Sequence, residues 1–150
     1  MQLNGKTTEL LALAGVIDPD AYAAGTYTTA WVPAKEFTML AALVSVGDMV
    51  ATSTVNAKLE QATSSGGAGA KDVTGKAITA LTQAGTDDNK QAWINVKPEE
   101  LDVDNAFAFV RLSMTVAVAA SDAGGFLFGY APSRGPATGV DLTSVDEVVG

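Results

Sequence analysis

The stretch of sequence that decides the fold is Ala106-Phe-Ala-Phe-Val-Arg-Leu-Ser-Met-Thr-Val-Ala-Val-Ala119. Its apolar and polar side chains alternate, with Val110, Leu112, Met114, Val116 and Val118 separated by Arg111, Ser113, Thr115 and Ala117. A period of two places the two sets on opposite faces of an extended chain. The alternation therefore predicts a β-strand with its apolar set in the core, and we expect it to lie centrally in a sheet.

Strand patterns recur on both sides of this segment, over residues 26–32, 37–46, 50–62, 73–82, 92–97 and 126–130. Pro33 closes the first of these strands, because proline cannot donate to a ladder, and Gly75 is expected to mark a bulge. Turn residues separate the segments, notably the runs 64–69 and 85–89, and Pro98 begins a single helical turn. Long helices that would cover a parallel sheet are missing from the sequence.

Two of these strands differ in their expected surroundings. Residues 37–46 are almost continuously apolar, as in a strand covered on both faces, with Gly47-Asp48 as the following turn. In residues 50–62, Val55, Ala57 and Leu59 alternate with polar residues, so we expect one face of this strand to be exposed to solvent. Together the segments predict an all-β protein, either an antiparallel β-sandwich or a jelly-roll-like barrel.

Both ends of the chain depart from this pattern. Residues 7–14 predict a short helix capped by Thr7 or Thr8 and ended by Asp18-Pro19-Asp20, or else an irregular arm. Residues 132–150 predict an extended arm pinned on a neighbouring subunit, or a frayed tail. The expected organisation is therefore an N-terminal arm (1–24), a β-sandwich domain (25–131) and a C-terminal arm (132–150).

Composition restricts the classes of function. The 150 residues include no His and no Cys, so the commonest general base, metal ligand and thiol nucleophile are missing. A net charge of −8 disfavours nucleic acid and anionic membranes as partners. Apolar residues make up 47% and charged residues only 17%, which indicates either a surface of small neutral side chains suited to protein docking or an Ala-rich core.

Four motifs invite a chemical interpretation, and each has an ordinary alternative. The carboxylate pairs Asp87-Asp88 and Glu99-Glu100 lie in expected turns, where solvated acids are common. Residues 102–105 resemble the start of a calcium loop but lack its later glycine and glutamate. Residues 66–71 resemble a phosphate loop but lack the Walker spacing, and a flexible hairpin tip explains them better. We therefore expect no catalytic, cofactor-binding or metal-binding residues, and no enzyme activity.

The aromatic residues have two interpretations. Trp93 falls on the polar side of its alternation, so it covers a sheet edge, packs in a second layer or contacts a partner. Trp31, Tyr27, Tyr130 and Phe109 are equally ambiguous. Packing is the simpler explanation, but an aromatic platform for sugars would have the same sequence pattern.

Part of the chain resembles a known group of proteins. The residues that carry the resemblance are Gly25-Thr-Tyr-Thr-Thr-Ala-Trp31, residues 37–47, Val55-Asn-Ala-Lys-Leu-Glu-Gln-Ala62, Lys71-Asp-Val-Thr-Gly-Lys76, and Leu101-Asp102 before Phe107-Ala-Phe-Val-Arg-Leu112. Over about residues 25–120 the chain resembles small proteins from the structural gene modules of tailed bacteriophages. No catalytic motif accompanies the resemblance.

The resemblance implies a capsid decoration (cement) protein that binds the outer head surface and stabilises the shell by bridging capsid subunits. Its implied partners are the major capsid protein and further copies of itself, with a trimer favoured. We expect the protein on the phage head surface after synthesis in the host cytoplasm, with no nucleic acid or membrane partner.

Three other functions remain open. A head-to-tail junction or tail protein would form rings. A carbohydrate-binding module would use Trp31, Trp93 or Tyr130 as its platform. A carboxylate hydrolase would need two acids within about 5 to 9.5 Å of each other in a cleft.

Overall fold

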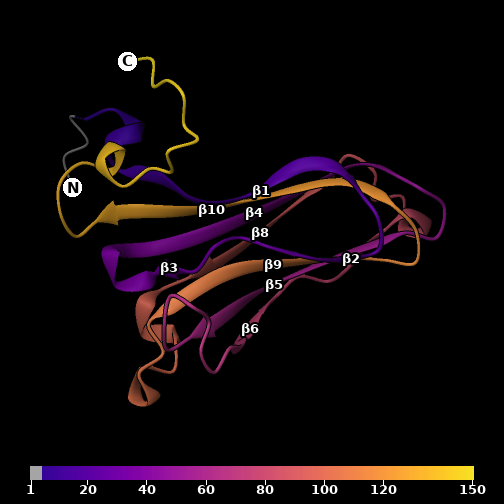
Figure 1. Cartoon of the computed structure of the whole chain (residues 1–150). Coiled ribbons are helices and arrows are strands. Elements are labelled where there is room, and N and C mark those ends of the chain that lie inside the picture. Colours follow the sequence, from indigo (N-terminus) through magenta and orange to yellow (C-terminus); the bar gives the residue numbers. More distant parts are fainter. Residues whose placement is uncertain (1–4) are drawn as a thin grey trace.

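In the computed structural model, which describes residues 5–150, two sheets face each other (Figure 1). The strands are β1 (Leu11–Tyr22), β2 (Gly25–Thr28), β3 (Val32–Pro33), β4 (Phe37–Met49), β5 (Thr54–Ala62), β6 (Lys71–Ala77), β7 (Leu81–Thr82), β8 (Gln91–Val96), β9 (Phe109–Ala117) and β10 (Ser121–Pro132). Short 3-10 helices connect them: η1 (Thr7–Glu9), η2 (Ala34–Glu36), η3 (Gln83–Gly85), η4 (Pro98–Glu100), η5 (Val103–Asn105) and η6 (Ala137–Gly139). The predicted all-β class is confirmed.

The strand order identifies the topology. Sheet A has the order β1-β10-β4-β8, and sheet B has the order β2-β9-β5-β6, with β3 also paired to β9 and β7 to β5. β2 and β3 can be counted as one interrupted strand, and β6 and β7 as another. The first strand, β1, then pairs with the last, β10, and the next pairs inward are β2 with β9, β4 with β8, and β5 with β6. A long antiparallel hairpin rolled up in this way is a jelly roll.

The strand β9 lies inside sheet B, as predicted. It pairs with β5 along its whole length and with β2 and β3 on its other side. Its inward residues Val110, Leu112, Met114 and Val116 are each at most 1% exposed, which confirms the predicted face. Val118 was wrongly included: β9 ends at Ala117, and Val118 has a φ of 68° and is exposed.

The core lies between the two sheets, which approach each other closely. Fully buried residues come from both sheets: Leu40, Val44, Val96 and Leu127 from sheet A, and Val55, Leu59, Leu112 and Met114 from sheet B. A Cβ added to Gly125 of β10 would lie 2.7 Å from Cδ2 of Leu112 in the opposite sheet. A Cβ added to Gly129 would lie 2.3 Å from the ring of Phe37. Glycine at these positions therefore makes room for core side chains.

The N-terminal segment corrects one prediction. Only Thr7–Glu9 is helical, as a single 3-10 turn, and Leu11–Tyr22 is a strand. This strand pairs with β10 from Leu11 to Tyr22, with a register shift between Ile17 and Asp20 that accommodates Pro19 at the sheet edge. Pairing with a distant strand has overridden a weak local helix preference. The predicted helix over 7–14 and its end at Asp18-Pro19-Asp20 are therefore wrong.

The expected N-terminal arm, residues 1–24, is also affected by this strand. Its residues 11–22 are a strand of sheet A rather than a separate segment. Residues 1–4 of that arm lie outside the described residues.

The strand β4 corrects two further predictions. It continues to Met49, so Gly47-Asp48 lies inside the strand instead of forming the turn. Leu40, Ala42, Val44 and Val46 are buried, whereas Ala41, Leu43 and Ser45 are half-buried and Met39 is exposed. The strand is therefore covered on one face only, and its second apolar row lies on the outside of sheet A.

Two predicted strands are interrupted. Residues 26–32 divide into β2 and β3, and the hydroxyl of Thr29 accepts a hydrogen bond from the backbone of Leu112 where the ladder is broken. Residues 73–82 divide into β6 and β7. The bulge predicted at Gly75 is confirmed: its φ is +74°, and it lies in a stretch where β6 slips relative to β5. The predicted helical turn after residue 97 is also confirmed, as η4.

The chain after β10 runs beside β1. The Leu142 N–H donates to the Leu13 carbonyl at 2.9 Å, and the Leu13 N–H donates to Asp141 Oδ1 at 2.7 Å. Ala137 is fully buried, whereas Val149 is 84% exposed. Residues 132–150 are thus attached to their own domain around residues 137–142, and their role as an arm toward a neighbour stays a prediction.

Candidate binding face

The outer face of sheet A carries an unusual number of apolar side chains. We call it the apolar face, and it consists of Leu11, Leu13 and Val16 from β1, Phe126, Phe128 and Tyr130 from β10, Met39, Ala41 and Leu43 from β4, and Trp93 from β8. These residues alternate with buried ones, so they point away from sheet B. The sheet register places them in rows that cross the strands, one of which is Val16, Phe126, Leu43 and Trp93.

Aromatic rings form the middle of this face. The Phe126 and Phe128 rings stack with centroids 6.0 Å apart, and the Trp93 ring lies 6.1 Å from that of Phe128. Trp93 is 58% exposed and Met39 is 40% exposed. Contiguous exposed apolar surface of this kind marks contact sites in soluble proteins.

The outer face of sheet B has the opposite character. A line of ion pairs crosses it: Arg111 Nη2 lies 2.7 Å from Glu60 Oε2, and Lys58 Nζ lies 3.5 Å from Glu60 and 2.6 Å from Asp72. The hydrogen bond to Asp72 raises the pKa of Lys58 above its usual value. Hydroxyl groups of Thr26 and Thr115 meet at 3.0 Å beside this line. One side of the sandwich is therefore apolar and the other polar.

The carboxylates that are adjacent in the sequence stabilise turns. Asp87 accepts a hydrogen bond from the Thr82 N–H at 2.9 Å and pairs with Lys90 at 2.7 Å, and the Lys90 hydrogen bond is the larger cause of its lowered pKa. Asp88 accepts from the Met49 N–H at 2.9 Å. Glu100 pairs with Lys76 at 2.8 Å, which lowers its pKa most, whereas its neighbour Glu99 is exposed. Asp87, Asp88 and Glu100 thus fix the backbone around β7, β4 and η4.

The calcium-like and phosphate-loop-like segments are joined to each other. Lys71 forms an ion pair with Asp102, and its ammonium group lies 4.2 Å from the centroid of the Phe107 ring. The hydrogen bond from Lys71, followed by that from Asn105, lowers the pKa of Asp102. Within residues 5–150, no group of three or more His, Cys, Asp or Glu side chains is arranged to hold a metal ion. The two motifs thus form a polar contact between the start of β6 and the residue that precedes η5.

The two tryptophans have different environments. Trp31 lies between β2 and β3, half-buried, with the Arg111 guanidinium 4.4 Å above its ring and Gly67 against its indole nitrogen. It is a packing residue of the polar side. Trp93 lies on the apolar face. Sequence reasoning singled out Trp93 but missed Phe126 and Phe128, although their spacing of two along a strand places them on one face.

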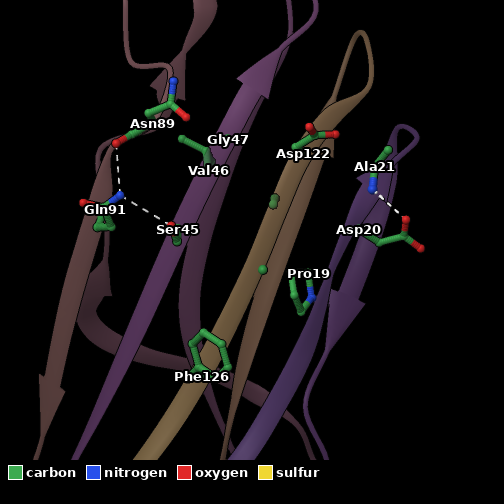
Figure 2. A pocket seen from close by; sticks show the side chains of 12 residues that line it. Pro19, Asp20, Ala21, Ser45, Val46, Gly47, Asn89, Gln91, Asp122 and Phe126 are labelled. Carbon is green, nitrogen blue, oxygen red and sulfur yellow. Dashed lines mark hydrogen bonds between the residues drawn. The ribbon is translucent and has the colours of Figure 1, made fainter.

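An open groove lies at one end of the outer side of sheet A, near the turns and next to the apolar face (Figure 2). Its volume is about 570 Å³, and Pro19, Asp20, Ser45, Gly47, Asn89, Gln91, Asp122, Gly124 and Phe126 are among the residues that line it. Figure 2 shows the contributing strands side by side, with Gln91 and Ser45 hydrogen-bonded across them. Glycine at positions 47 and 124 leaves the middle of the groove without side chains.

Comparison with known proteins gives remote similarities. No protein family and no curated protein sequence matches the chain. Among solved structures, Bacillus endospore appendages, described as disulfide-linked pili, align at 14% identity and a TM-score of 0.43, covering 89% of this chain and 100% of that one.

Two viral structures have similar scores. The Gx strain of infectious bursal disease virus aligns at 12% identity and a TM-score of 0.44, covering 85% of this chain but only 34% of that one. Broad Bean Stain Virus aligns at 10% identity and a TM-score of 0.44, covering 89% and 93%. Among the described residues, no helix is long and apolar enough to cross a membrane.

Proposed function

We propose that this chain is a bacteriophage virion protein of the head decoration type, which lays its apolar face on the capsid shell and bridges neighbouring capsid subunits. The observation that carries the proposal is the contrast between the two outer faces of the sandwich. A monomer has no use for a face of exposed Met and Trp and half-buried Phe and Leu side chains on one side only, whereas a docking protein buries them against its partner. The resemblance of residues 25–120 to phage structural proteins supports the same function.

Two features of the surface favour a docking function over a catalytic function. The groove at the end of sheet A is open, and Asp87, Asp88 and Glu100 are engaged in ion pairs and turns. The segment after β10, with Val148 and Val149 exposed beside the apolar face, is the better candidate for a bridging arm, because residues 11–22 are committed to sheet A. We further propose a trimer in solution and a position on the head surface.

The test uses shells purified from phage that lack this gene product. Wild-type protein and two variants are added to the shells, and bound copies are counted after sedimentation. Met39→Glu places a carboxylate on the apolar face, and we expect at least about tenfold weaker binding, since a buried unpaired charge costs more than about 1.4 kcal/mol. Thr28→Glu places the same charge on the exposed polar face of β2 and should bind as wild type.

The number of bound copies separates the proposal from its alternative. Copies in proportion to the major capsid subunits support a head decoration protein, whereas a single ring at one vertex would assign the chain to the head-to-tail junction. Equal binding by both variants would contradict the use of the apolar face. Sedimentation equilibrium of the free protein tests the trimer.

A further inference from the structure

The groove at the end of the apolar face has two chemically different walls (Figure 2). One wall is the ring of Phe126 on β10, and the register continues this row beyond the groove with Leu43 on β4 and Trp93 on β8. Two residues further along these strands, Gly124, Ser45 and Gln91 form the floor. The step from bulky rings to glycine and serine is what makes the surface hollow.

Polar side chains with free hydrogen-bonding groups form the other wall. Gln91 Nε2 donates to Ser45 Oγ at 3.5 Å and to the Asn89 carbonyl at 3.0 Å, which fixes the amide in place. Within the described part of the chain, the Gln91 Oε1 atom, the Asn89 side-chain amide and the Asp122 carboxylate have no hydrogen-bond partner. Donors and acceptors therefore face solvent in the same groove as the Phe126 ring.

A sugar ring has the complementary chemistry. Its C–H face packs on an aromatic ring, while its hydroxyl groups exchange hydrogen bonds with amides and carboxylates. An open groove with a few placed polar groups is a common form of small-ligand site. Asp20 and Asp122 border the groove without an ion-pair partner among residues 5–150, which disfavours sugars that carry carboxylate or sulfate.

We propose that this groove, lined by Phe126 and Gln91 and flanked by Trp93 on β8, binds a neutral saccharide. The inference shares Phe126 with the apolar face of the docking proposal, but the docking variant Met39→Glu lies toward the other end of that face, so the two experiments can fail separately. A shallow site of this kind binds weakly in a single copy, and display of many copies on one particle would raise the avidity.

The experiment is a binding screen followed by a titration. Full-length protein is applied to an array of neutral and acidic glycans, and the best neutral oligosaccharide on that array is titrated into ¹⁵N-labelled protein. The chain has two tryptophans, so the indole N–H signals of Trp93 and Trp31 report on the groove and on the opposite side of the sandwich in the same sample. We expect the Trp93 signal to shift and the Trp31 signal to stay.

Variants then test the two walls separately. Phe126→Ala and Gln91→Ala should each weaken binding at least about tenfold, whereas Phe126→Tyr, which keeps a ring, should stay within about threefold of wild type. Asn56→Ala, on the exposed face of β5, is the matched control and should bind normally. Each variant is first checked for an unchanged unfolding midpoint.

Three results would overturn the inference. They are the lack of any neutral glycan that binds, equal or tighter binding of acidic glycans, and a Trp31 shift as large as that of Trp93. A change of oligomeric state in Phe126→Ala, without any saccharide effect, would assign this end of the face to protein contact instead.

Discussion

Replacing Gly129 by alanine tests the packing between β10 and β4 most directly. Gly129 pairs with Ala12 of β1 and Leu40 of β4, and its position faces the ring of Phe37, which is only 4% exposed. An added Cβ would lie 2.3, 2.3 and 2.5 Å from three ring atoms. Carbon atoms in contact stand about 3.5–4.0 Å apart, so the buried ring must move by more than about 1 Å.

The expected loss follows from two opposing effects. Overpacking a core costs about 1–3 kcal/mol, and an overlap of this size belongs at the upper end. The backbone of Gly129 does not have a positive φ, so alanine fits its conformation and recovers about 0.4–1 kcal/mol by restricting the unfolded chain. We expect a net loss of about 2 kcal/mol in the free energy of unfolding. For a protein of this size, that lowers the melting temperature by about 4–8 °C.

Urea unfolding followed by tryptophan fluorescence measures this loss. Gly139→Ala is the matched control, because an added Cβ there meets nothing within 4 Å and should leave stability almost unchanged. In the background Phe37→Leu, the smaller side chain makes room, so the added cost of alanine at position 129 should fall by at least about 1 kcal/mol. A Gly129→Ala variant as stable as Gly139→Ala, or a cost that Phe37→Leu leaves unchanged, would refute the proposed clash.

Three further predictions concern the core, the ion pairs and the chain ends. Leu112→Ala should lower the free energy of unfolding by about 2–5 kcal/mol in a urea titration, because Leu112 is fully buried between the sheets. The pKa values of Asp87, Glu100 and Asp102 are lowered in the folded protein, so their stabilising contribution is present near neutral pH and is lost as the pH falls through those values. The urea midpoint should therefore stay level from about pH 7 to pH 5 and decrease at pH values below about 4. The decrease should be less steep in Asp102→Asn, and a midpoint that increases in acid would contradict this assignment. Removal of residues 143–150 should leave the near-ultraviolet circular dichroism of the domain intact, whereas removal of residues 5–22 should abolish it, since the second deletion removes β1 from sheet A.

The sequence was sufficient for the strands that have one apolar and one polar face. In β9 and β5 the alternation of side chains directly encodes the two environments, and both faces were predicted correctly. The strand β4 was misjudged because its outward row is also apolar, and a sequence does not say whether such a row is covered by its own chain or left open. β1 was misjudged because Leu10, Leu13 and Ala14 fit a helical period, while the strand β10 that fixes it as extended is distant in sequence.

The candidate groove was out of reach of sequence reasoning for a related reason. Its lining combines Phe126 and Asp122 from β10, Ser45 from β4 and Gln91 from β8, and only the register of these strands brings them together. That register depends on pairings across the whole chain rather than on any local motif. Trp93 alone gave a local signal, because a large ring stands at a position where the alternation predicts a polar residue.

The position of β10 between β1 and β4 has a consequence for biosynthesis. Sheet A cannot be completed until its last strand has been synthesised. In a growing or truncated polypeptide, β1 and β4 therefore have unpaired backbone hydrogen-bonding groups along one edge and exposed rows of apolar side chains. Such an intermediate is open to strand exchange with other copies, which makes complete translation a condition for soluble product. A premature stop before residue 121 should yield inclusion bodies rather than a smaller folded protein.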